Sequence, residues 1–278
     1  MENLKLSGVD TQMPVVALVQ FAPLLGNIEA NISRIGLLLN KVKADVVVLP
    51  ELASSGYAFS DRNEAFQCAE TVYDSVYIRF LTSRAADGNY FIVSGFNERD
   101  GDRLFNTAIL VGPSGFIGKY RKMHLFWNEA DLFEPGDTGL PVFEIAGIKL
   151  GMLVCFDWMF PEVWRILALK GVDLVAHPSN LVLPFCQQAV AVHALCNRFY
   201  VATANRIGSE RDLHFTGGSV LVSPLGETLV KGPLEDPFVG IHAIDLTLSR
   251  NKNITPRNTL KESRRPECYT FLTSETKN

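Results

Sequence analysis

Residues 151–162, GMLVCFDWMFPE, constrain the fold of this chain more than any other segment. Gly151 to Val154 read as the end of a buried strand, and Pro161 opens a helical run, VWRILALKG. Cys155 therefore lies between a strand end and a helix start, where a thiolate is favoured because helix N-termini attract anions. Taken alone, Cys155 is more simply interpreted as a buried, inert residue. A chemical role requires partners elsewhere in the chain.

The composition is that of a protein that forms a hydrophobic core. With 278 residues, of which 47% are hydrophobic and 20% charged, the chain suits a single domain over residues 1–278. The net charge of −4, without a long basic or acidic block, argues against nucleic acid as a partner. No apolar run reaches the ~18 residues that a membrane helix needs. Residues 1–12 lack the apolar segment of a secretory signal, so we expect a cytoplasmic protein without a membrane partner.

The five cysteines are an odd set without metal-ligand spacing. This pattern predicts reduced thiols, as in the cytosol, and no metal site. Cys68, Cys186 and Cys196 lie among apolar residues in expected helices, and we interpret them as packing residues. No GxGxxG or P-loop spacing is present, so nothing indicates a nucleotide.

The order of the expected elements predicts a layered α/β domain. Apolar residues at helical spacing predict helices over residues 27–43, 74–86, 161–170 and 184–198. Apolar runs predict strands at 14–21, 45–50, 90–97, 104–112, 115–121, 141–145, 148–154, 173–177, 199–205, 217–223, 226–231 and 239–245. This order favours two sheets in the middle of the domain, and a single doubly wound sheet is the alternative. Residues 122–138 form a long aromatic loop, which is typical of a segment that serves a site.

Three charged residues are candidates to act with Cys155. Glu51 follows the buried run DVVVLP, at the end of a strand where α/β sheets place ligands. Half-buried there it would serve as a general base, and a carboxylate that caps the next turn is the alternative. Lys122 ends the strand GFIGKYRK, where its ammonium can lower the pKa of a thiol or hold an oxyanion, while strand alternation places Arg121 on the opposite face. Glu129, among aromatic residues, is a partner of the lysine or an acceptor within the loop.

Three segments in this order carry a resemblance to a known family: PELASSGY, GKYRKMHLF and CFDWMFPE. They are similar to the signature blocks of the nitrilase superfamily of carbon–nitrogen hydrolases. FEPGD (133–137), HPSNL (177–181) and FTGGSVLVSPLGE (215–227) also match, so the resemblance covers about residues 14–270. It implies a four-layer α-β-β-α sandwich of the nitrilase type and no metal or organic cofactor. It also implies subunits that pair into homodimers or larger homo-oligomers.

The resemblance also implies residue roles. The base of the superfamily maps to Glu51, its lysine to Lys122 and its nucleophile to Cys155, and its frequent second glutamate maps to Glu129. In the implied mechanism the thiolate of Cys155 attacks an amide carbonyl or a nitrile carbon, and Glu51 moves the protons. The resulting oxyanion is stabilised by Lys122 and by the backbone N–H of Phe156.

The residues after the cysteine bear on the substrate. Nitrilases usually have Trp-Glu where this chain has Phe156-Asp157, which favours an amidase or carbamoylase, and Asp157 is assigned to holding the turn. Relatives that bind a free carboxylate often carry an arginine where this chain has Trp158-Met159, so we expect a small, neutral amide or N-carbamoyl amine. The segment is similar to that of carbamoylputrescine amidases, and also to that of small archaeal and bacterial relatives that act on dinitriles. A nitrilase is therefore the alternative.

Candidate walls of the substrate pocket are Tyr57, Phe126, Trp127, Trp158 and Asn180. Plain core packing is the alternative for each aromatic residue.

Two other classes of function and one structural expectation complete the predictions. A non-catalytic binding protein on the same fold would have no need for the intact set of acid, lysine and cysteine. A thiol-redox protein would need a resolving cysteine, for which Cys186 and Cys196 are the candidates. Residues 247–278 carry many charges and few apolar groups, and we expect an extended tail that packs on a partner subunit.

Overall fold

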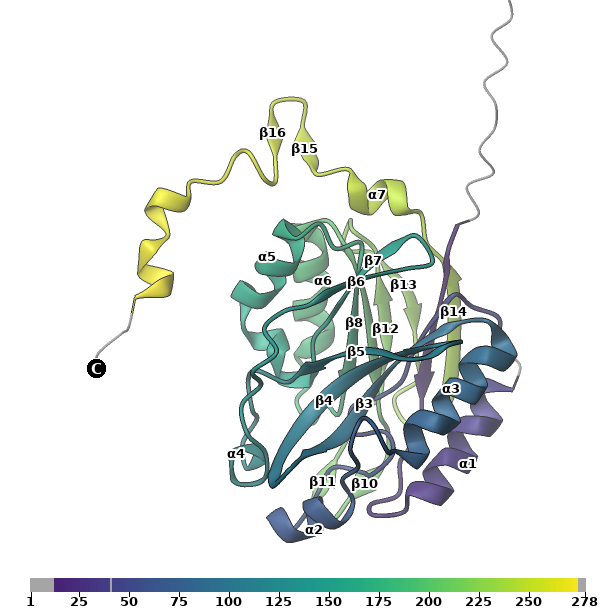
Figure 1. Cartoon of the computed structure of the whole chain (residues 1–278). Coiled ribbons are helices and arrows are strands. Elements are labelled where there is room, and N and C mark those ends of the chain that lie inside the picture. Colours follow the sequence, from purple (N-terminus) through teal and green to yellow (C-terminus); the bar gives the residue numbers. More distant parts are fainter. Residues whose placement is uncertain (1–12, 41, 275–278) are drawn as a thin grey trace, which may run out of the picture.

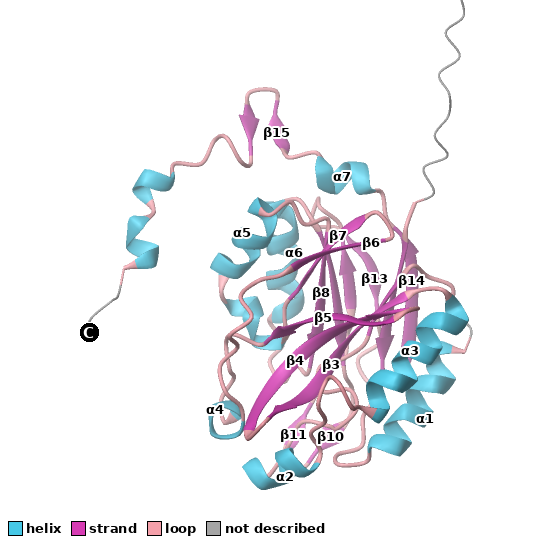
Figure 2. Cartoon of the chain, viewed as in Figure 1, coloured by secondary structure: helices cyan, strands magenta, loops and turns pink. Residues whose placement is uncertain are grey.

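Two facing β-sheets lie between two layers of helices in the computed structural model, which describes residues 13–40 and 42–274 (Figures 1 and 2). The first sheet has six strands in the order β14 (Phe238–Ala243), β1 (Val15–Gln20), β2 (Val46–Val48), β3 (Phe91–Asp100), β4 (Arg103–Gly112) and β5 (Gly115–Arg121). The second has six in the order β13 (Thr228–Lys231), β12 (Val220–Val222), β9 (Tyr200–Asn205), β8 (Leu174–Ser179), β7 (Ile148–Met152) and β6 (Val142–Ile145). The predicted two-sheet α/β architecture is confirmed, and the single doubly wound sheet is wrong.

The two sheets share one pattern of strand directions, which sequence reasoning missed. In the first sheet β1, β2 and β3 run parallel. Antiparallel β14 flanks β1, and on the other side β4 is antiparallel to β3 and β5 is antiparallel to β4. In the second sheet β7, β8 and β9 run parallel, between antiparallel β6 and the antiparallel pair β12 and β13. Ligand sites of α/β sheets form at the carboxyl ends of parallel strands. Glu51 follows β2, Cys155 follows β7 and Asn180 follows β8.

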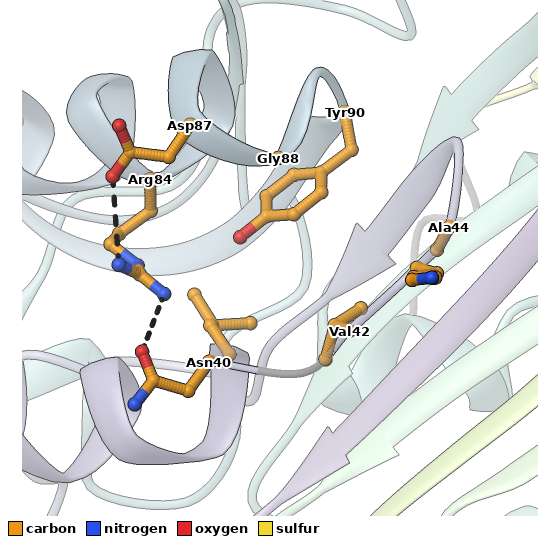
Figure 3. A pocket seen from close by; sticks show the side chains of 9 residues that line it. Asn40, Val42, Ala44, Arg84, Asp87, Gly88 and Tyr90 are labelled. Carbon is orange, nitrogen blue, oxygen red and sulfur yellow. Dashed lines mark hydrogen bonds and ion pairs between the residues drawn. The ribbon is translucent and has the colours of Figure 1, made fainter.

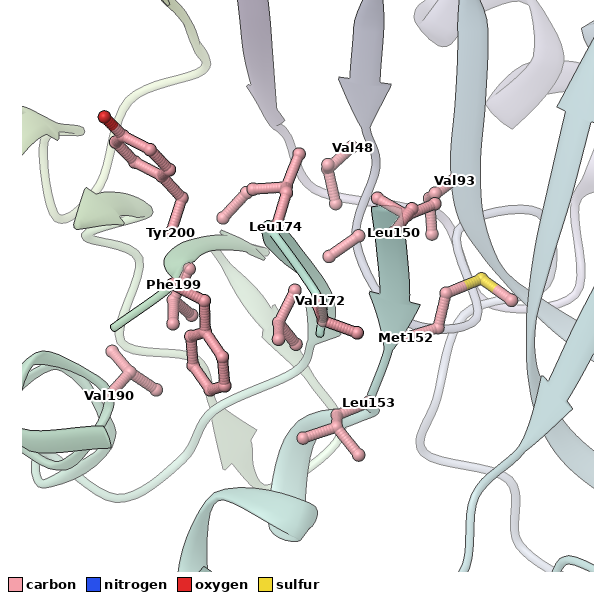
Figure 4. Close-up of a cluster of buried hydrophobic side chains, with 14 of the residues drawn as sticks. Val48, Val93, Leu150, Met152, Leu153, Val172, Leu174, Val190, Phe199 and Tyr200 are labelled. Atoms are coloured by element: carbon pink, nitrogen blue, oxygen red, sulfur yellow. The ribbon is translucent and has the colours of Figure 1, made fainter. Parts of the chain in front are cut away.

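Apolar side chains fill the space between the sheets and the space beneath the helices. Val48 and Val93 of the first sheet share one buried cluster with Leu150 and Met152 of the second (Figure 4). Helices α1 (Ile28–Leu39) and α3 (Val76–Gly88) cover the outer face of the first sheet, and α5 (Pro161–Leu169) and α6 (Cys186–Asn197) cover that of the second (Figure 1). Each layer thus buries the apolar stripe of its neighbour.

Helix boundaries follow their capping residues. Asn27 caps α1, its side chain accepting a hydrogen bond from Ala30 N at 3.0 Å, but the helix ends at Leu39 rather than at residue 43 as predicted. The helix predicted to end at residue 86 continues to Gly88, and Asn89 in the left-handed conformation ends it. Two short helices, α2 (Arg62–Gln67) and α4 (Glu129–Leu132), were not predicted.

Smaller elements complete the fold. They are the 3₁₀ helices η1 (Cys155–Met159), η2 (Pro266–Cys268) and η3 (Thr270–Thr273), helix α7 (Leu246–Arg250), and the hairpins of β10 (Ser209–Glu210) with β11 (Leu213–His214) and of β15 (Asn253–Thr255) with β16 (Asn258–Thr259). Residues 251–274, here called the C-terminal arm, lead away from the sandwich (Figure 1). Phe271 is 75% exposed on this arm.

The structure tests the expectation about the cysteines, and it does not describe the segment on which the expectation about a secretory signal rests. Cys186 is buried as expected, whereas Cys196 is exposed, so a packing role for Cys196 is wrong. The expectation about a secretory signal falls on residues 1–12, which lie outside the described residues. In the described part of the chain, no helix has the length and apolar character needed to cross a membrane.

Candidate active site

Glu51, Lys122 and Glu129 meet in one buried group, here called the inner cluster. Lys122 Nζ donates to Glu51 Oε1 at 2.8 Å and to Glu129 Oε1 at 2.7 Å, and the three side chains are at most 1% exposed. Asn106 Nδ2 also donates to Glu51 Oε1, at 2.7 Å, while Glu51 Oε2 has no partner among the described residues. Glu51 is thus fully buried, not half-buried as predicted. It presents one free carboxylate oxygen.

Lys122 remains charged in this cluster. Burial lowers its pKa, but Glu129 and Glu51 more than offset burial, so that the pKa is raised. Burial raises the pKa of Glu129, and the Lys122 ammonium offsets only part of that rise. The cluster therefore holds one fixed cation between two carboxyl groups, and this excess of carboxyl groups suits it to exchange a proton.

Cys155 begins η1, separated from the end of β7 by Leu153 and Val154, and has a positive φ of 41°. A non-glycine residue in this left-handed conformation costs roughly 1–3 kcal/mol and needs support from its surroundings. Asp157 supplies part of that support. Its buried carboxylate accepts from Val154 N at 2.8 Å, from the Tyr120 hydroxyl at 2.9 Å and lies 2.7 Å from His124 Nδ1. These contacts join the turn of the cysteine to β5 and to the loop that follows it.

The charges around Cys155 correct one expectation. Burial raises the pKa of the Cys155 thiol well above its usual range, and Glu51 raises it further, while Lys122 and the N–H of Asn180 lower it only in part. The expected lowering of the thiol pKa by the lysine is therefore outweighed. The thiol therefore holds its proton at rest, and a thiol in this state needs a base before it can act as a nucleophile.

The predicted pocket walls occupy different depths. The Tyr57 hydroxyl donates to Glu129 Oε1 at 2.7 Å, and Phe126 N donates to Glu129 Oε2 at 3.1 Å, so both residues touch the inner cluster. Trp158 is buried within η1 itself. Trp127 is 70% exposed and lies at the surface.

Asn180 is a buried polar residue without a side-chain partner. It follows β8, is 2% exposed, and neither Nδ2 nor Oδ1 has a hydrogen-bond partner among the described residues. Its backbone N–H lowers the pKa of the Cys155 thiol, which places it near that side chain. A buried amide with both polar atoms free is costly unless a bound molecule satisfies it.

Sequence reasoning missed the support behind Tyr57. Glu210 Oε2 accepts from Tyr57 N at 2.8 Å and Ala58 N at 2.9 Å, and Arg206 Nη1 donates to Glu210 Oε1 at 2.6 Å. The Arg206 guanidinium lies 3.9 Å from the ring centroid of Phe215, whose ring meets that of Tyr57 edge to face. The sequence signal was an Arg and a Glu four residues apart between two predicted strands.

A second ionic group, here called the outer cluster, surrounds Arg121. It comprises Glu98, Asp100, Lys119, Arg121 and Asp137. Arg121 lies on the opposite face from Lys122, as predicted, and it is buried. Asp137 belongs to the end of the long loop, so this cluster ties the loop back to β5.

Two cavities lie away from Cys155. One of about 790 Å³ opens between the ends of α1 and α3, where Arg84 contacts Asn40 and Asp87 (Figure 3). The other, of about 1150 Å³, lies between α5, α6 and the C-terminal arm. Within residues 13–40 and 42–274, no group of three or more His, Cys, Asp or Glu side chains could hold a metal ion.

The sequence model of the carbon-nitrogen hydrolase family matches residues 15–252. The chain belongs to this family. The hydrolase is 45% identical, over 92% of its length and 99% of the relative, to a protein of Pyrococcus abyssi (strain GE5 / Orsay) named nitrilase. It is 30% identical, over 85% of its length and 86% of the relative, to an (R)-stereoselective amidase of Pseudomonas sp. A carbon-nitrogen hydrolase structure from Helicobacter pylori G27 matches with a TM-score of 0.84 at 25% identity, covering 94% of this chain and 99% of the other.

Proposed function

We propose that the hydrolase converts a small, uncharged nitrile to its carboxylic acid, with Cys155 as the nucleophile. The observation that carries the chemistry is the bonding of Lys122 to both Glu51 and Glu129 in a buried cluster beside the Cys155 thiol. The choice of a nitrile rests on the relative from Pyrococcus abyssi that is named nitrilase.

In this mechanism Glu51 takes the thiol proton while the sulfur of Cys155 attacks the nitrile carbon, and the proton passes on to the nitrogen to give a thioimidate. Water adds to the thioimidate carbon, and the tetrahedral intermediate expels ammonia, which leaves a thioester on the sulfur. A second water, activated by Glu51, hydrolyses the thioester to the acid and restores the thiol. Lys122 and the N–H of Phe156 stabilise the negative charge that develops on the nitrogen or oxygen bonded to the reacting carbon.

Hydrolysis of an amide or N-carbamoyl amine is the second candidate. An amide enters the same sequence at the tetrahedral intermediate, so the inner cluster needs no new group to cleave it. Phe156-Asp157 in place of the Trp-Glu of nitrilases favours this substrate, and so does the relative named (R)-stereoselective amidase.

The charges around the inner cluster support an uncharged substrate. In the part of the chain that the structure describes, Lys122 in the inner cluster and Arg206 near Glu51 are both already bonded to carboxylates. A substrate carboxylate would meet no free cation there. Asn180 offers both a free donor and a free acceptor to a neutral polar group.

The test is ammonia release from aliphatic amides, carbamoyl amines, carbamoyl amino acids and small mono- and dinitriles, with wild type beside Cys155→Ala. We expect release from nitriles, with acid as the product and no activity in the variant. Release from amides or carbamoyl amines alone would establish the second candidate. Equal release by both proteins would overturn the role of Cys155.

We also propose that the C-terminal arm packs on a second copy of the chain. The arm exposes Ile254, Phe271 and Leu272, and the larger cavity separates it from α5 and α6. Exposed apolar surface of this kind is typical of a protein interface. Light scattering should give the mass of at least a dimer, and a chain ending at residue 250 should form an assembly with fewer subunits. A monomeric full-length chain would contradict the proposal.

A further inference from the structure

His177 bonds to the backbone of the nucleophile. It lies on β8, is fully buried, and its Nε2 is 2.9 Å from the carbonyl oxygen of Cys155. Its other ring nitrogen, Nδ1, is 3.0 Å from Thr203 Oγ1 on β9. The imidazole thus links the second sheet to the turn on which the nucleophile lies.

The partners of the ring fix its tautomer. A carbonyl oxygen only accepts, so Nε2 carries the proton and donates it to Cys155 O. Nδ1 is then the acceptor, and the Thr203 hydroxyl donates to it. Burial lowers the pKa of His177 to about 4, and the bond to Cys155 O offsets this only in part, so the ring is neutral near pH 7.

The carbonyl of Cys155 and the N–H of Phe156 belong to the same peptide group. That peptide bond is trans, and a trans peptide is planar with its C=O and N–H pointing in opposite directions. Fixing the carbonyl against His177 therefore fixes the direction of the Phe156 N–H. Among the described residues, this N–H donates to no backbone carbonyl outside its own helical turn and to no side chain.

We infer that His177 is a positioning residue: by holding the Cys155 carbonyl, it orients the Phe156 N–H toward the oxyanion that forms when Cys155 is acylated. The inference rests on the proposed function, in which that N–H stabilises the oxyanion. Thr203 acts one step further out, since its hydroxyl keeps the proton of the ring on Nε2.

The chain offers a matched control in His193. Its Nε2 is 2.9 Å from the carbonyl oxygen of Trp158, three residues further along the same turn, and its ring stacks on Trp164. A histidine that merely stiffens η1 would act from either position. Of these two histidines, His177 contacts the peptide group that carries the Phe156 N–H, and His193 does not.

The experiment compares two reactions of the Cys155 thiol, each followed by mass spectrometry of the peptide that contains it. Acylation by 4-nitrophenyl acetate develops an oxyanion, whereas alkylation by iodoacetamide does not. Loss of an oxyanion donor typically costs about 100-fold or more, so a misdirected donor should cost roughly 10- to 100-fold. We expect His177→Phe to slow acylation by that factor and to change alkylation by no more than about threefold.

Two further variants make the result specific. His177→Gln retains an N–H donor and should recover acylation to within about fivefold of wild type. Thr203→Val keeps the shape of β9 and should slow acylation by about threefold to tenfold. It also serves if His177→Phe does not fold. His193→Phe should leave the ratio of acylation to alkylation unchanged.

An equal fall in acylation and alkylation in His177→Phe would overturn the inference, because it would mean that the thiol itself is displaced. Unchanged acylation in both His177→Phe and Thr203→Val would overturn it as well. Because 4-nitrophenyl acetate replaces the natural substrate, failure of the proposed nitrile hydrolysis would appear separately, as the absence of ammonia release by wild type.

Discussion

Arg121 and Lys122 are consecutive residues at the end of β5, yet the two ionic groups around them differ in construction. Lys122 bonds to two fully buried carboxylates in the inner cluster. Arg121, on the other face, bonds to buried Glu98 at 2.6 Å but also to Asp100 at 2.8 Å and Asp137 at 2.9 Å, whose side chains are half exposed. Strand alternation alone produces this division.

Under the proposed function, this difference assigns proton transfer to the inner cluster and structural support to the outer cluster. In the inner cluster a single cation is enclosed with two carboxyl groups, close to the Cys155 thiol. A proton there can be exchanged mainly between the carboxyl groups and the thiol. In the outer cluster the charges of Asp100 and Asp137 are shared with solvent, and the guanidinium lies 3.6 Å from the ring centroid of Phe105. The outer cluster holds the ends of the loop together, and the inner cluster uses the side chains that the loop delivers.

The largest effect is expected for Lys122→Met. Without the cation, two buried carboxyl groups face each other and the oxyanion loses a donor, so kcat should fall by about 1,000-fold or more. Removing one partner of a buried ion pair also destabilises a fold by about 3–5 kcal/mol. Activity assays and thermal unfolding should show both losses, with Lys119→Met as the control in the same strand. More than one tenth of wild-type activity in Lys122→Met would contradict this account.

Arg121→Met should lower the stability of the fold strongly and kcat only slightly. It leaves the buried Glu98 without its guanidinium partner, which should lower the free energy of unfolding by about 3 kcal/mol. The inner cluster keeps all of its bonds, so kcat should change by less than about tenfold at a temperature where the variant is folded. Urea unfolding and a rate assay on the same sample check this. A loss of rate as large as that of Lys122→Met would show that the two clusters are not separate.

The fold and the catalytic candidates were largely predictable, because they rest on local patterns. Glu51, Lys122 and Cys155 each follow a strand that its apolar residues mark, and the structure brings Glu51 and Lys122 into direct contact. The sequence could not show how deeply the charged residues are buried. The burial of Arg121 could not be predicted, because its buried partner, Glu98, lies on β3 and meets it only across the sheet.

The contacts of His177 and Glu210 could not be predicted for the same reason, although His177 belongs to the matching segment HPSNL. The contact of His177 with Cys155 joins β8 to the turn after β7, and that of Glu210 with Tyr57 spans most of the chain. Neither spacing forms a motif. The raised thiol pKa of Cys155 likewise depends on burial and on Glu51, whereas the sequence offered only the nearby lysine.

As the pH falls, the fold should lose stability first through His177, beside Cys155, and only then through the outer cluster. The folded-state pKa of His177, about 4, is lower than the value near 6.5 of an unfolded histidine, so its contribution to stability is complete above pH 6.5 and is lost as the pH falls toward 4. Between pH 7 and pH 5 the free energy of unfolding should drop by about 2 kcal/mol through this residue. The bond from Arg121 lowers the pKa of Asp100, so the outer cluster loses stability only at lower pH, below the ordinary range of a carboxyl group.

Urea unfolding at pH 7 and pH 5 measures the first window, and His177→Gln should remove most of the drop. An identical drop in wild type and His177→Gln would assign the acid sensitivity to another group.

The smallest effect is expected for Asp137→Asn. Its carboxylate is half exposed, and such ion pairs contribute about 0.2–1 kcal/mol. The variant should lose no more than this in urea unfolding and should hydrolyse substrate at nearly the wild-type rate. A larger loss of rate would mean that this end of the loop positions Glu129 more directly than the bonds of Arg121 indicate.

The central claim is that Cys155 carries the covalent intermediate with the inner cluster around it. Peptide mass spectrometry after an acid quench tests it most directly, on wild type and Glu51→Gln incubated with the best substrate of the panel. We predict one adduct on the peptide that contains Cys155, with the mass of the thioimidate or thioester. We predict that this adduct is absent in Lys122→Met. An adduct on another cysteine with Cys155 unmodified, or ammonia release by Cys155→Ala at the wild-type rate, would contradict the claim.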